Sequence, residues 1–294
     1  MADLKSEADA SNSNKPNDFV PFKPGAARYA GKDVSFADLA PQLEPEPGIE
    51  AGVDLKGKKK IIFAAGRGKT GKTTLLRWIT EKSVRQGAQP ILADIDPSNA
   101  SFSRFFENVA RPDTDNPAGV AHWLQELIEH CIAEKQSAVI DLGGGDTTLR
   151  TLATEMPGLS VQIEAAGIVP VMLYMLGTQP EDLTPALTLA ERGFATTAQA
   201  LVLNEVAIDA GITRSMAFAR ILNSPSFLKL TKSSVTVWMP RLFAADAIES
   251  RLCGFHDARD VRVEPPLGVF DSARVRAWLD AMDRRFAGID TWIP

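Results

Sequence analysis

The stretch Gly66-Arg67-Gly68-Lys69-Thr70-Gly71-Lys72-Thr73-Thr74 decides the fold of this chain. An apolar run at residues 60–65 precedes it and is typical of a buried strand, and residues with helical periodicity follow it. A turn of the form G-x-x-x-x-G-K-T between a strand and a helix presents backbone N–H groups and a helix N-terminus to phosphate oxygens. The sequence therefore predicts a site for a nucleoside triphosphate.

Apolar runs and helix-like stretches alternate from residue 60 onward. The expected strands are residues 61–65, 91–95, 138–142, 168–176, 200–204 and 235–239. The expected helices are residues 72–86, 118–135, 147–155, 180–192, 212–222 and 272–286. Uninterrupted apolar strands separated by helices predict an α/β domain with a doubly wound, mainly parallel sheet covered by helices on both faces. Ligands of such a sheet bind at the carboxyl ends of its strands, where the glycine-rich loop lies.

Residues 1–56 are predicted to be a flexible, poorly ordered N-terminal tail, and residues 57–294 the nucleotide-binding domain. Residues 6–17 are polar and residues 41–50 are rich in proline and glutamate, so neither stretch buries enough apolar surface to offset its ordering entropy. A few aromatic residues interrupt this polarity and suggest a short segment that docks on the domain or on a partner. They are Phe19, Phe22, Tyr29 and Phe36.

The loop residues predict how a nucleotide is held. Lys72 is expected to reach the β- and γ-phosphates, and the Thr73 hydroxyl to bind Mg²⁺. The rest of the loop would surround the phosphates. The expected nucleotide-binding residues are Gly66, Gly68, Lys69, Thr70, Gly71, Lys72, Thr73 and Thr74.

Two expected strands end in carboxylates beside this loop. The second ends Asp94-Ile95-Asp96-Pro97, which places Asp96 near the γ-phosphate and Mg²⁺ or, in the simpler alternative, makes an Asp-Pro turn. The third ends in Asp141 and three glycines, Gly143 to Gly145. An apolar strand that ends in Asp predicts a Mg²⁺ ligand that acts through water. The glycines allow close approach to the γ-phosphate or form a flexible turn.

These motifs resemble the ParA/MinD family of deviant Walker A ATPases, whose loop reads G-K-G-G-x-G-K-[ST]-T and whose second strand ends D-x-D-P. The resemblance covers about residues 60–286. It implies that Asp96 positions the attacking water and that Lys72, Asp96 and Arg67 are the catalytic residues, with Thr73, Asp141 and Asp96 around the metal. It also implies that Asn204, at the end of the fifth strand, contacts adenine, although an Asn there is equally suited to capping a turn.

The loop departs from this family at two positions. The signature lysine, which reaches the nucleotide of the partner protomer, is Arg67 here, and a family glycine is Lys69. Arg binds phosphate oxygens bidentately, so Arg67 is favoured as the cross-dimer group and Lys69 is the alternative. The family's Q-x-x-N is not clean, with Asn99 three residues after Asp96, and glycines replace its Pro-Pro. A divergent branch is expected, of the plasmid partition, stability or conjugation type.

By this resemblance the protein is an ATPase that forms a homodimer with ATP and Mg²⁺ and falls apart after hydrolysis. Turnover is expected to be slow, to be accelerated by a partner protein or cargo adaptor, and to position cargo such as plasmid DNA or a protein complex. One alternative is a P-loop enzyme of the kinase or ligase type that acts on a small molecule, but the sequence shows no acceptor-site motif. Another is an inert scaffold, which the intact Lys72, Thr73, Asp96 and Asp141 argue against.

The charge of the chain is uneven, with a formal net value of −5. Residues 211–294 carry twelve Lys and Arg against nine Asp and Glu, so this third is the natural place for a non-specific DNA contact. The alternative is a solvated surface of mixed charge. The basic residues concerned are Arg214, Arg220, Lys229, Lys232, Arg241, Arg251, Arg259 and Arg262.

The last expected helix carries an apolar stripe flanked by arginines. The stripe consists of Val275, Trp278, Leu279, Met282 and Phe286. It fits either a membrane-surface helix, as in MinD-like proteins, or core packing, and core packing is favoured because amphipathic helices normally face their own core. DNA is therefore preferred over membrane as the surface that the protein binds.

The remaining composition fits the cytoplasm, with nucleoid association if DNA is bound. The two cysteines, Cys131 and Cys253, argue against a disulfide framework. The first residues lack the apolar segment of a signal peptide. The longest apolar run, residues 167–176, is too short to span a bilayer.

Overall fold

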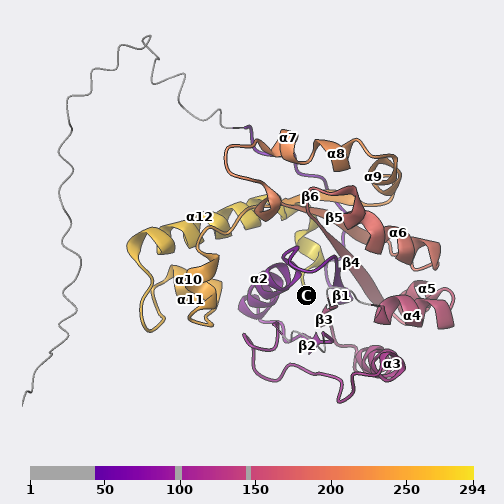
Figure 1. The fold of residues 1–294 in the computed structure, drawn as a ribbon. Helices are drawn as coiled ribbons and strands as arrows, with labels where there is room; N and C mark the ends of the chain where they lie inside the picture. The colour runs from indigo at the N-terminus through magenta and orange to yellow at the C-terminus, as the bar shows by residue number, and fades with distance from the viewer. Residues whose placement is uncertain (1–43, 97–100, 144–146) are drawn as a thin grey trace, which may run out of the picture. The chain divides into compact units, whose positions relative to one another are not determined.

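Strand β1 (Lys59–Ala65) lies in the middle of a parallel sheet and is buried on both faces (Figure 1). Its side chains alternate between two apolar cores, with Ile61 and Phe63 in one and Ile62 and Ala64 in the other. The computed structural model describes residues 44–96, 101–143 and 147–294. The expectations for the aromatic residues of the tail, Asn99, Gly144 and Gly145 therefore concern residues outside this description.

The described residues contain six strands in the order β2-β3-β1-β4-β5-β6, each paired in parallel with its neighbours. The other strands are β2 (Ile91–Asp94), β3 (Ala138–Asp141), β4 (Ile168–Leu176), β5 (Ala198–Asn204) and β6 (Val235–Met239). The chain leaves β1 for the edge strand β2, returns through β3, and then continues on the other side of β1. The winding therefore reverses at β1, and a crevice is expected at the carboxyl end of such a reversal.

Helices cover both faces of the sheet, which confirms the predicted fold class. One face carries α3 (Pro117–Glu134), α4 (Thr148–Glu155), α5 (Leu159–Ala165), α6 (Thr184–Glu191), α7 (Arg214–Ala217), α8 (Ala219–Leu222) and α9 (Pro225–Leu230). The other carries α2 (Lys72–Arg85), α10 (Ala245–Glu249), α11 (Phe255–Arg259), α12 (Val269–Arg285) and the 3₁₀ helix η3 (Ala287–Trp292). The apolar stripe of α12 is buried in this second core, in agreement with the core-packing interpretation.

The expected elements differ from the structure mainly at their boundaries. The expected helix at 180–192 begins as a 3₁₀ turn, η1 (Pro180–Leu183), before α6. The expected helix at 212–222 is two single turns, α7 and α8. The short helices α5, α9, α10 and α11 were not expected, because five to seven residues are too few to show a helical period.

Residues 44–56, which the sequence analysis assigns to the tail, lie against the domain. The compact unit extends from Glu44 to Pro294. The N–H of Gly52 donates to the carbonyl of Gly288 over 2.9 Å, and the Trp292 indole donates to the carbonyl of Val53 over 2.8 Å. We call residues 44–56 the strap. It has no helix or strand, and many of its contacts are with residues far away along the sequence.

Across residues 44–96, 101–143 and 147–294, no helix has the length and apolarity needed to cross a bilayer.

Candidate nucleotide-binding site

The glycine-rich loop occupies residues 66–71 and connects β1 directly to α2. Two of its residues have left-handed backbone conformations, Lys69 with φ 65° and Gly71 with φ 93°. The Thr70 hydroxyl donates to the carbonyl of Arg67 over 2.8 Å and fixes the turn. The loop thus reverses direction and brings the N-terminus of a 14-residue helix to the carboxyl end of the sheet, which is the arrangement that binds phosphate.

Close packing explains two of the loop glycines. A Cβ on Gly66 would lie 2.7 Å from the carbonyl oxygen of Met175. A Cβ on Gly71 would collide with the side-chain amide of Asn204. Any larger residue at these positions would push the loop away from β4 and β5, the strands that support it from behind.

The Lys72 side chain lies along the inside of the loop. Its Nζ donates to the carbonyl of Gly66 over 3.0 Å and to the carbonyl of Arg67 over 3.3 Å. Although it is charged, the residue is buried. A buried ammonium beside these neutral carbonyls is well placed to bind phosphate oxygens, because a charge-assisted bond is about twice as strong as a neutral one.

Thr73 and Asp141 meet at the floor of the cleft. The Thr73 hydroxyl donates to Oδ2 of Asp141 over 2.7 Å and lies 2.9 Å from the Ser101 hydroxyl. Burial raises the pKa of the Asp141 carboxyl to about 7, and the charges of Asp94 and Asp96 add to this, against the opposing effects of the Thr73 hydrogen bond and Lys72. A cation bound here would therefore displace a proton near neutral pH.

Asp94 and Asp96 have different surroundings, although the sequence places them two residues apart. Asp94 is 1% exposed, and its two oxygens accept the N–H groups of Asp96 and Ser103 over 3.2 and 3.0 Å. Asp96 lines the cleft, and its Cγ lies 3.3 Å from where a Cβ of Gly143 would be. Asp94 thus anchors the loop after β2, whereas Asp96 faces the site.

The donor set at this floor fits Mg²⁺. Hydroxyl and carboxylate oxygens from Thr73 and Asp141 are hard ligands, which Mg²⁺ prefers. Among the described residues, no group of three or more His, Cys, Asp or Glu side chains could hold a metal ion. In the usual Mg²⁺ site of a nucleotide-binding protein, one or two protein ligands are completed by water and phosphate.

Asn204 supports the loop from behind. Its side-chain Nδ2 donates to the carbonyl of Thr70 over 2.8 Å, and its Oδ1 accepts the N–H of Val206 over 3.0 Å. The residue is 3% exposed and also lines the cleft. Both of its polar atoms are engaged, so the structure gives Asn204 a definite positioning role, and its contact with adenine stays a prediction.

The cleft has a volume of about 460 Å³, which is within the usual range for small-molecule sites. Most of the predicted site residues share it. They are Gly68, Lys69, Gly71, Lys72, Thr73, Thr74, Asp96, Asp141 and Asn204. The cleft is also lined by Val206, Met239, Pro240 and Leu242, which add apolar surface suited to a planar base.

Arg77 is a cleft residue that sequence reasoning missed. Its guanidinium carbon lies 3.4 Å from the ring centre of Phe105 and 4.4 Å from that of Phe255. Its Nη2 donates to the carbonyl of Cys253 over 3.0 Å, while its buried Nε has no partner among the described residues. Burial lowers the pKa of Arg77 to about 10. Its place on the helix, one turn after Lys72 and Thr73, is the only sequence signal for it.

Arg67 and Lys69 face different sides of the loop. Lys69 lines the nucleotide cleft, whereas Arg67 lines a separate cavity together with Gly66. The Arg67 side chain is 57% exposed, and its Nη1 lies 3.3 Å from Oδ1 of the buried Asp182. Asp182 also accepts the N–H groups of Gly177 and Gln179, so it is fixed independently of Arg67.

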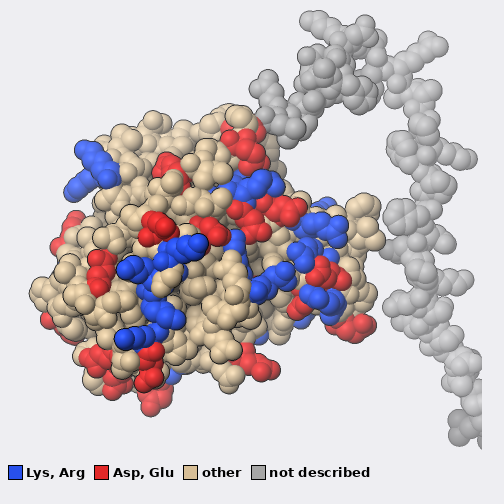
Figure 2. Space-filling view, turned by 180° about the vertical axis from the view of Figure 1, so that it is seen from behind, with Lys and Arg blue, Asp and Glu red and all other residues tan. Residues whose placement is uncertain are grey.

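Many of the basic side chains expected to contact DNA have partners within the protein. Arg214 is ion-paired with Glu205, Arg259 with Asp260, and Arg262 with Asp257 and Asp260. The side chains of Arg241 and Arg251 donate to backbone carbonyls. Figure 2 shows Lys and Arg interleaved with Asp and Glu over one face of the molecule. This agrees with the mixed-charge alternative more closely than with a continuous basic surface.

No protein-family model and no curated protein matches this chain. Solved structures with a similar arrangement include chloroplast FtsY from Physcomitrella patens, with 11% identity over 77% of this chain and 66% of that chain and a TM-score of 0.42. The signal recognition particle receptor FtsY from Elizabethkingia anophelis has 16% identity over 65% and 60% of the two chains and a TM-score of 0.41. The cell division protein FtsY from Thermotoga maritima has 12% identity over 66% of each chain and a TM-score of 0.39.

This chain thus spans about 60–66% of the length of these FtsY chains. They are not ParA or MinD proteins, so the comparisons do not confirm that resemblance. At these identities and TM-scores, the chain is not assigned to any family. Its own geometry identifies a parallel α/β sheet with a phosphate-binding loop between β1 and α2, which is the fold of a P-loop nucleotide-binding protein.

Proposed function

We propose that this protein is a nucleoside-triphosphate-dependent switch that binds ATP and Mg²⁺, dimerises, and resets by hydrolysis. One observation carries the proposal. The Thr73 hydroxyl lies 2.7 Å from the Asp141 carboxylate at the base of a phosphate-binding loop, and Asp96 lines the same cleft. ATP rather than GTP is proposed from the resemblance of the loop.

The residues divide the chemical work among them. The Lys72 ammonium exchanges two neutral carbonyl acceptors for charged phosphate oxygens. Bound Mg²⁺ supplies positive charge to the phosphates. The Asp96 carboxylate accepts a hydrogen bond from a water and holds it in line with the γ-phosphorus, while backbone N–H groups at the start of α2 stabilise charge on the phosphate oxygens.

Dimerisation is proposed through the face that carries Arg67. That side chain is exposed, and it points away from the cleft of its own protomer. Its fork would reach the phosphates of the second protomer, while Lys69 would serve its own nucleotide. Cargo positioning on DNA belongs to the same proposal and rests on the resemblance, because many of the arginines in question have partners within the protein.

Size-exclusion chromatography with light scattering tests the switch. The full chain with Asp96→Ala is measured with ATP–Mg²⁺, with ADP and without nucleotide, and DNA is then added at low salt. We expect a dimer with ATP alone, and we expect Arg67→Ala to abolish it in the Asp96→Ala background. The control for Asp96→Ala is Asp115→Ala, which removes an exposed carboxylate and leaves the cleft intact. A monomer in every state would contradict dimerisation, and a dimer that does not retain DNA would exclude DNA as the surface.

A second candidate is a P-loop enzyme that transfers phosphate to a small acceptor. The observation that favours it is the cavity lined by Arg67 and Gly66, which lies beside the loop. Transfer would give a phosphorylated acceptor instead of free phosphate, so phosphorus NMR of the products distinguishes the two candidates.

A further inference from the structure

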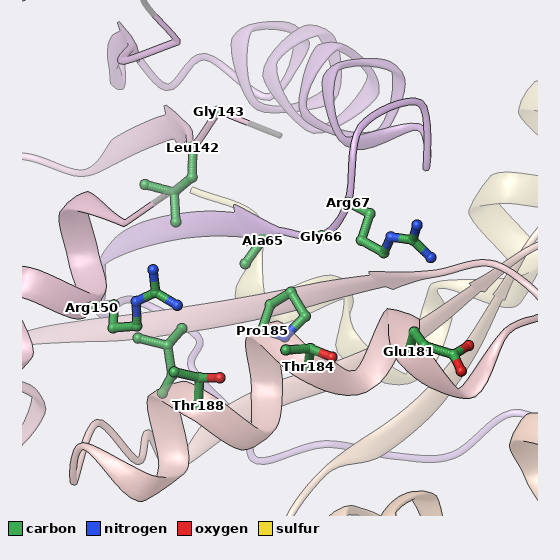
Figure 3. Close-up of a pocket in the computed structure, with 11 residues that line it drawn as sticks. Ala65, Gly66, Arg67, Leu142, Gly143, Arg150, Glu181, Thr184, Pro185 and Thr188 are labelled. Carbon is green, nitrogen blue, oxygen red and sulfur yellow. The ribbon is translucent and has the colours of Figure 1, made fainter. Parts of the chain in front are cut away.

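A second cavity lies beside the phosphate-binding loop and is separate from the nucleotide cleft (Figure 3). Its walls come from the ends of β1 and β3, from α4, and from the η1–α6 segment. Its volume is about 410 Å³, which is enough for a small organic molecule. Neither the loop motif nor the proposed nucleotide chemistry needs such a cavity.

Much of the wall is apolar. Ala65, Leu142 and Leu189 are buried residues of this wall, and Pro185 adds to its apolar surface. Surface of this kind favours the hydrocarbon part of a ligand, since removing apolar area from water is favourable.

Arg150 supplies a positive charge at the edge of this apolar surface. The residue is partly buried on α4, and its carbonyl accepts the Thr154 hydroxyl. Among the described residues, its guanidinium has no hydrogen-bond acceptor and no ion-pair partner. Figure 3 shows Arg150 and Thr188 at one end of the cavity and Arg67 and Glu181 toward the other. A guanidinium without a partner among the described residues, beside a hydroxyl and apolar walls, fits a carboxylate, which it can bind with two parallel hydrogen bonds.

The other charged residues of the wall make the Arg150 end of the cavity the more favourable place for an anion. Arg67 already pairs with Asp182 at 3.3 Å. Glu181 is exposed, and at the far end it would repel a second negative charge. The ligand that fits is therefore a monoanion with an apolar body, with its carboxylate at Arg150.

The cavity shares its wall with the nucleotide machinery. Gly66 lines it and gives its carbonyl to Lys72. Gly143 lines it as well and lies against Asp96. A shift of either glycine would move the walls of both the cavity and the nucleotide cleft. A ligand in one would then change the affinity of the other for its own ligand, and such coupling is reciprocal.

We propose that this cavity binds a small organic acid through Arg150 and Thr188, and that nucleotide bound in the neighbouring cleft changes its affinity. The first part stands without the proposed function. The second part rests on it, because it needs the cleft to bind nucleotide.

Fluorescence titration with 1-anilinonaphthalene-8-sulfonate, an apolar anion, tests the first part on the full chain without nucleotide, with octanoate as competitor. We expect saturable binding that octanoate displaces. Arg150→Gln should weaken it at least tenfold, and Thr188→Phe, which fills the cavity, should do the same. The control is Arg192→Gln, which removes an equal charge from the exposed end of α6 and should stay within twofold of wild type. Unchanged affinity in both cavity variants, or no saturable binding, would overturn the proposal.

The second part is tested by repeating the titration with ADP and with a non-hydrolysable ATP analogue. We expect the probe affinity to differ at least threefold between the two nucleotides. Binding of a fluorescent ATP derivative to the same samples is measured separately. Normal nucleotide binding with equal probe affinity in both states overturns the coupling alone, whereas no nucleotide binding contradicts the proposed function and leaves the cavity result standing.

Discussion

At the residue scale, the Asp141 carboxyl is held in the folded protein at a cost in stability. Burial raises its pKa to about 7, far above the value of an Asp in an unfolded chain. Between those two values the unfolded chain has lost a proton that the folded protein keeps, so the free energy of unfolding falls as the pH rises from about 4 to about 7. Above that range the loss is complete.

Asp141→Asn should therefore raise the unfolding free energy of the metal-free protein more at pH 8 than at pH 5. The difference between the two increases should be roughly 2 kcal/mol. Urea unfolding in EDTA at both pH values measures this. Asp115→Asn, at an exposed position, is the control and should shift the two curves equally. An equal effect of Asp141→Asn at pH 5 and pH 8 would show that its carboxyl is not buried as described.

Asn204→Ala separates support of the loop from recognition of the base. It leaves the carbonyl of Thr70 and the N–H of Val206 without their partner, so we expect a loss of about 1–3 kcal/mol in unfolding free energy. If positioning is its main role, the affinities for ATP and GTP derivatives fall by the same factor. A loss for ATP alone would instead show that Asn204 contacts adenine.

Lys69 occupies a backbone conformation that favours glycine. Its φ of 65° costs a non-glycine residue about 1–2 kcal/mol. Glycine relieves this but has more freedom when unfolded, so Lys69→Gly should raise the unfolding free energy by about 0.5 kcal/mol, measured by urea denaturation. Lys69→Val should lower it, because a β-branched residue fits this conformation poorly. A stable valine variant would contradict the described loop.

At the element scale, the sequence predicted all six strands of the described residues, because each contains a short, largely apolar run. Strands β4 and β6 agree with the prediction at both ends. The ends of several helices differ from the prediction by one to a few residues. The motifs predicted many of the residues that line the cleft, but not Arg77 and Ser101. These two reach the cleft only because segments that are distant in the sequence meet there.

The strap shows what local composition cannot reveal. Its prolines and glutamates predicted a tail, yet Glu46 pairs with Arg285 at 2.9 Å and Glu50 accepts the N–H of Thr236 over 2.6 Å. Its glycine also fits closely, because a Cβ on Gly52 would collide with Trp292. These contacts exist only because residues more than 180 positions away fold alongside.

Two truncations test the strap. Removal of residues 1–43 should keep the melting temperature within about 2 °C of the full chain and preserve nucleotide binding. Removal of residues 1–56 should lower the melting temperature by several degrees more, because it deletes the buried Leu55 and the hydrogen bonds to η3. Differential scanning calorimetry measures both. Equal melting temperatures of the two truncated proteins would show that the strap contributes nothing to stability.

At the scale of the whole molecule, the winding of the sheet brings the chemistry together. Because β1 and β3 are neighbours, the glycine-rich loop and the Asp141 carboxylate meet at one edge, and β2 adds Asp96 to it. The reversal at β1 also places β4 on its other side, where the η1–α6 segment forms the second cavity. The glycine-rich loop therefore separates the nucleotide cleft from the second cavity. This arrangement supports the proposal that nucleotide in the cleft changes the affinity of the cavity for its ligand.

Titration of the full chain with fluorescent ATP and GTP derivatives in Mg²⁺ tests the central claim most directly. Lys72→Ala removes the buried ammonium, and Lys58→Ala removes an exposed one. We expect saturable binding by the wild type and by the Lys58 variant, and a loss of affinity of roughly tenfold or more in the Lys72 variant. Binding of neither nucleotide by the wild type, or equal affinity in the Lys72 variant, would contradict it.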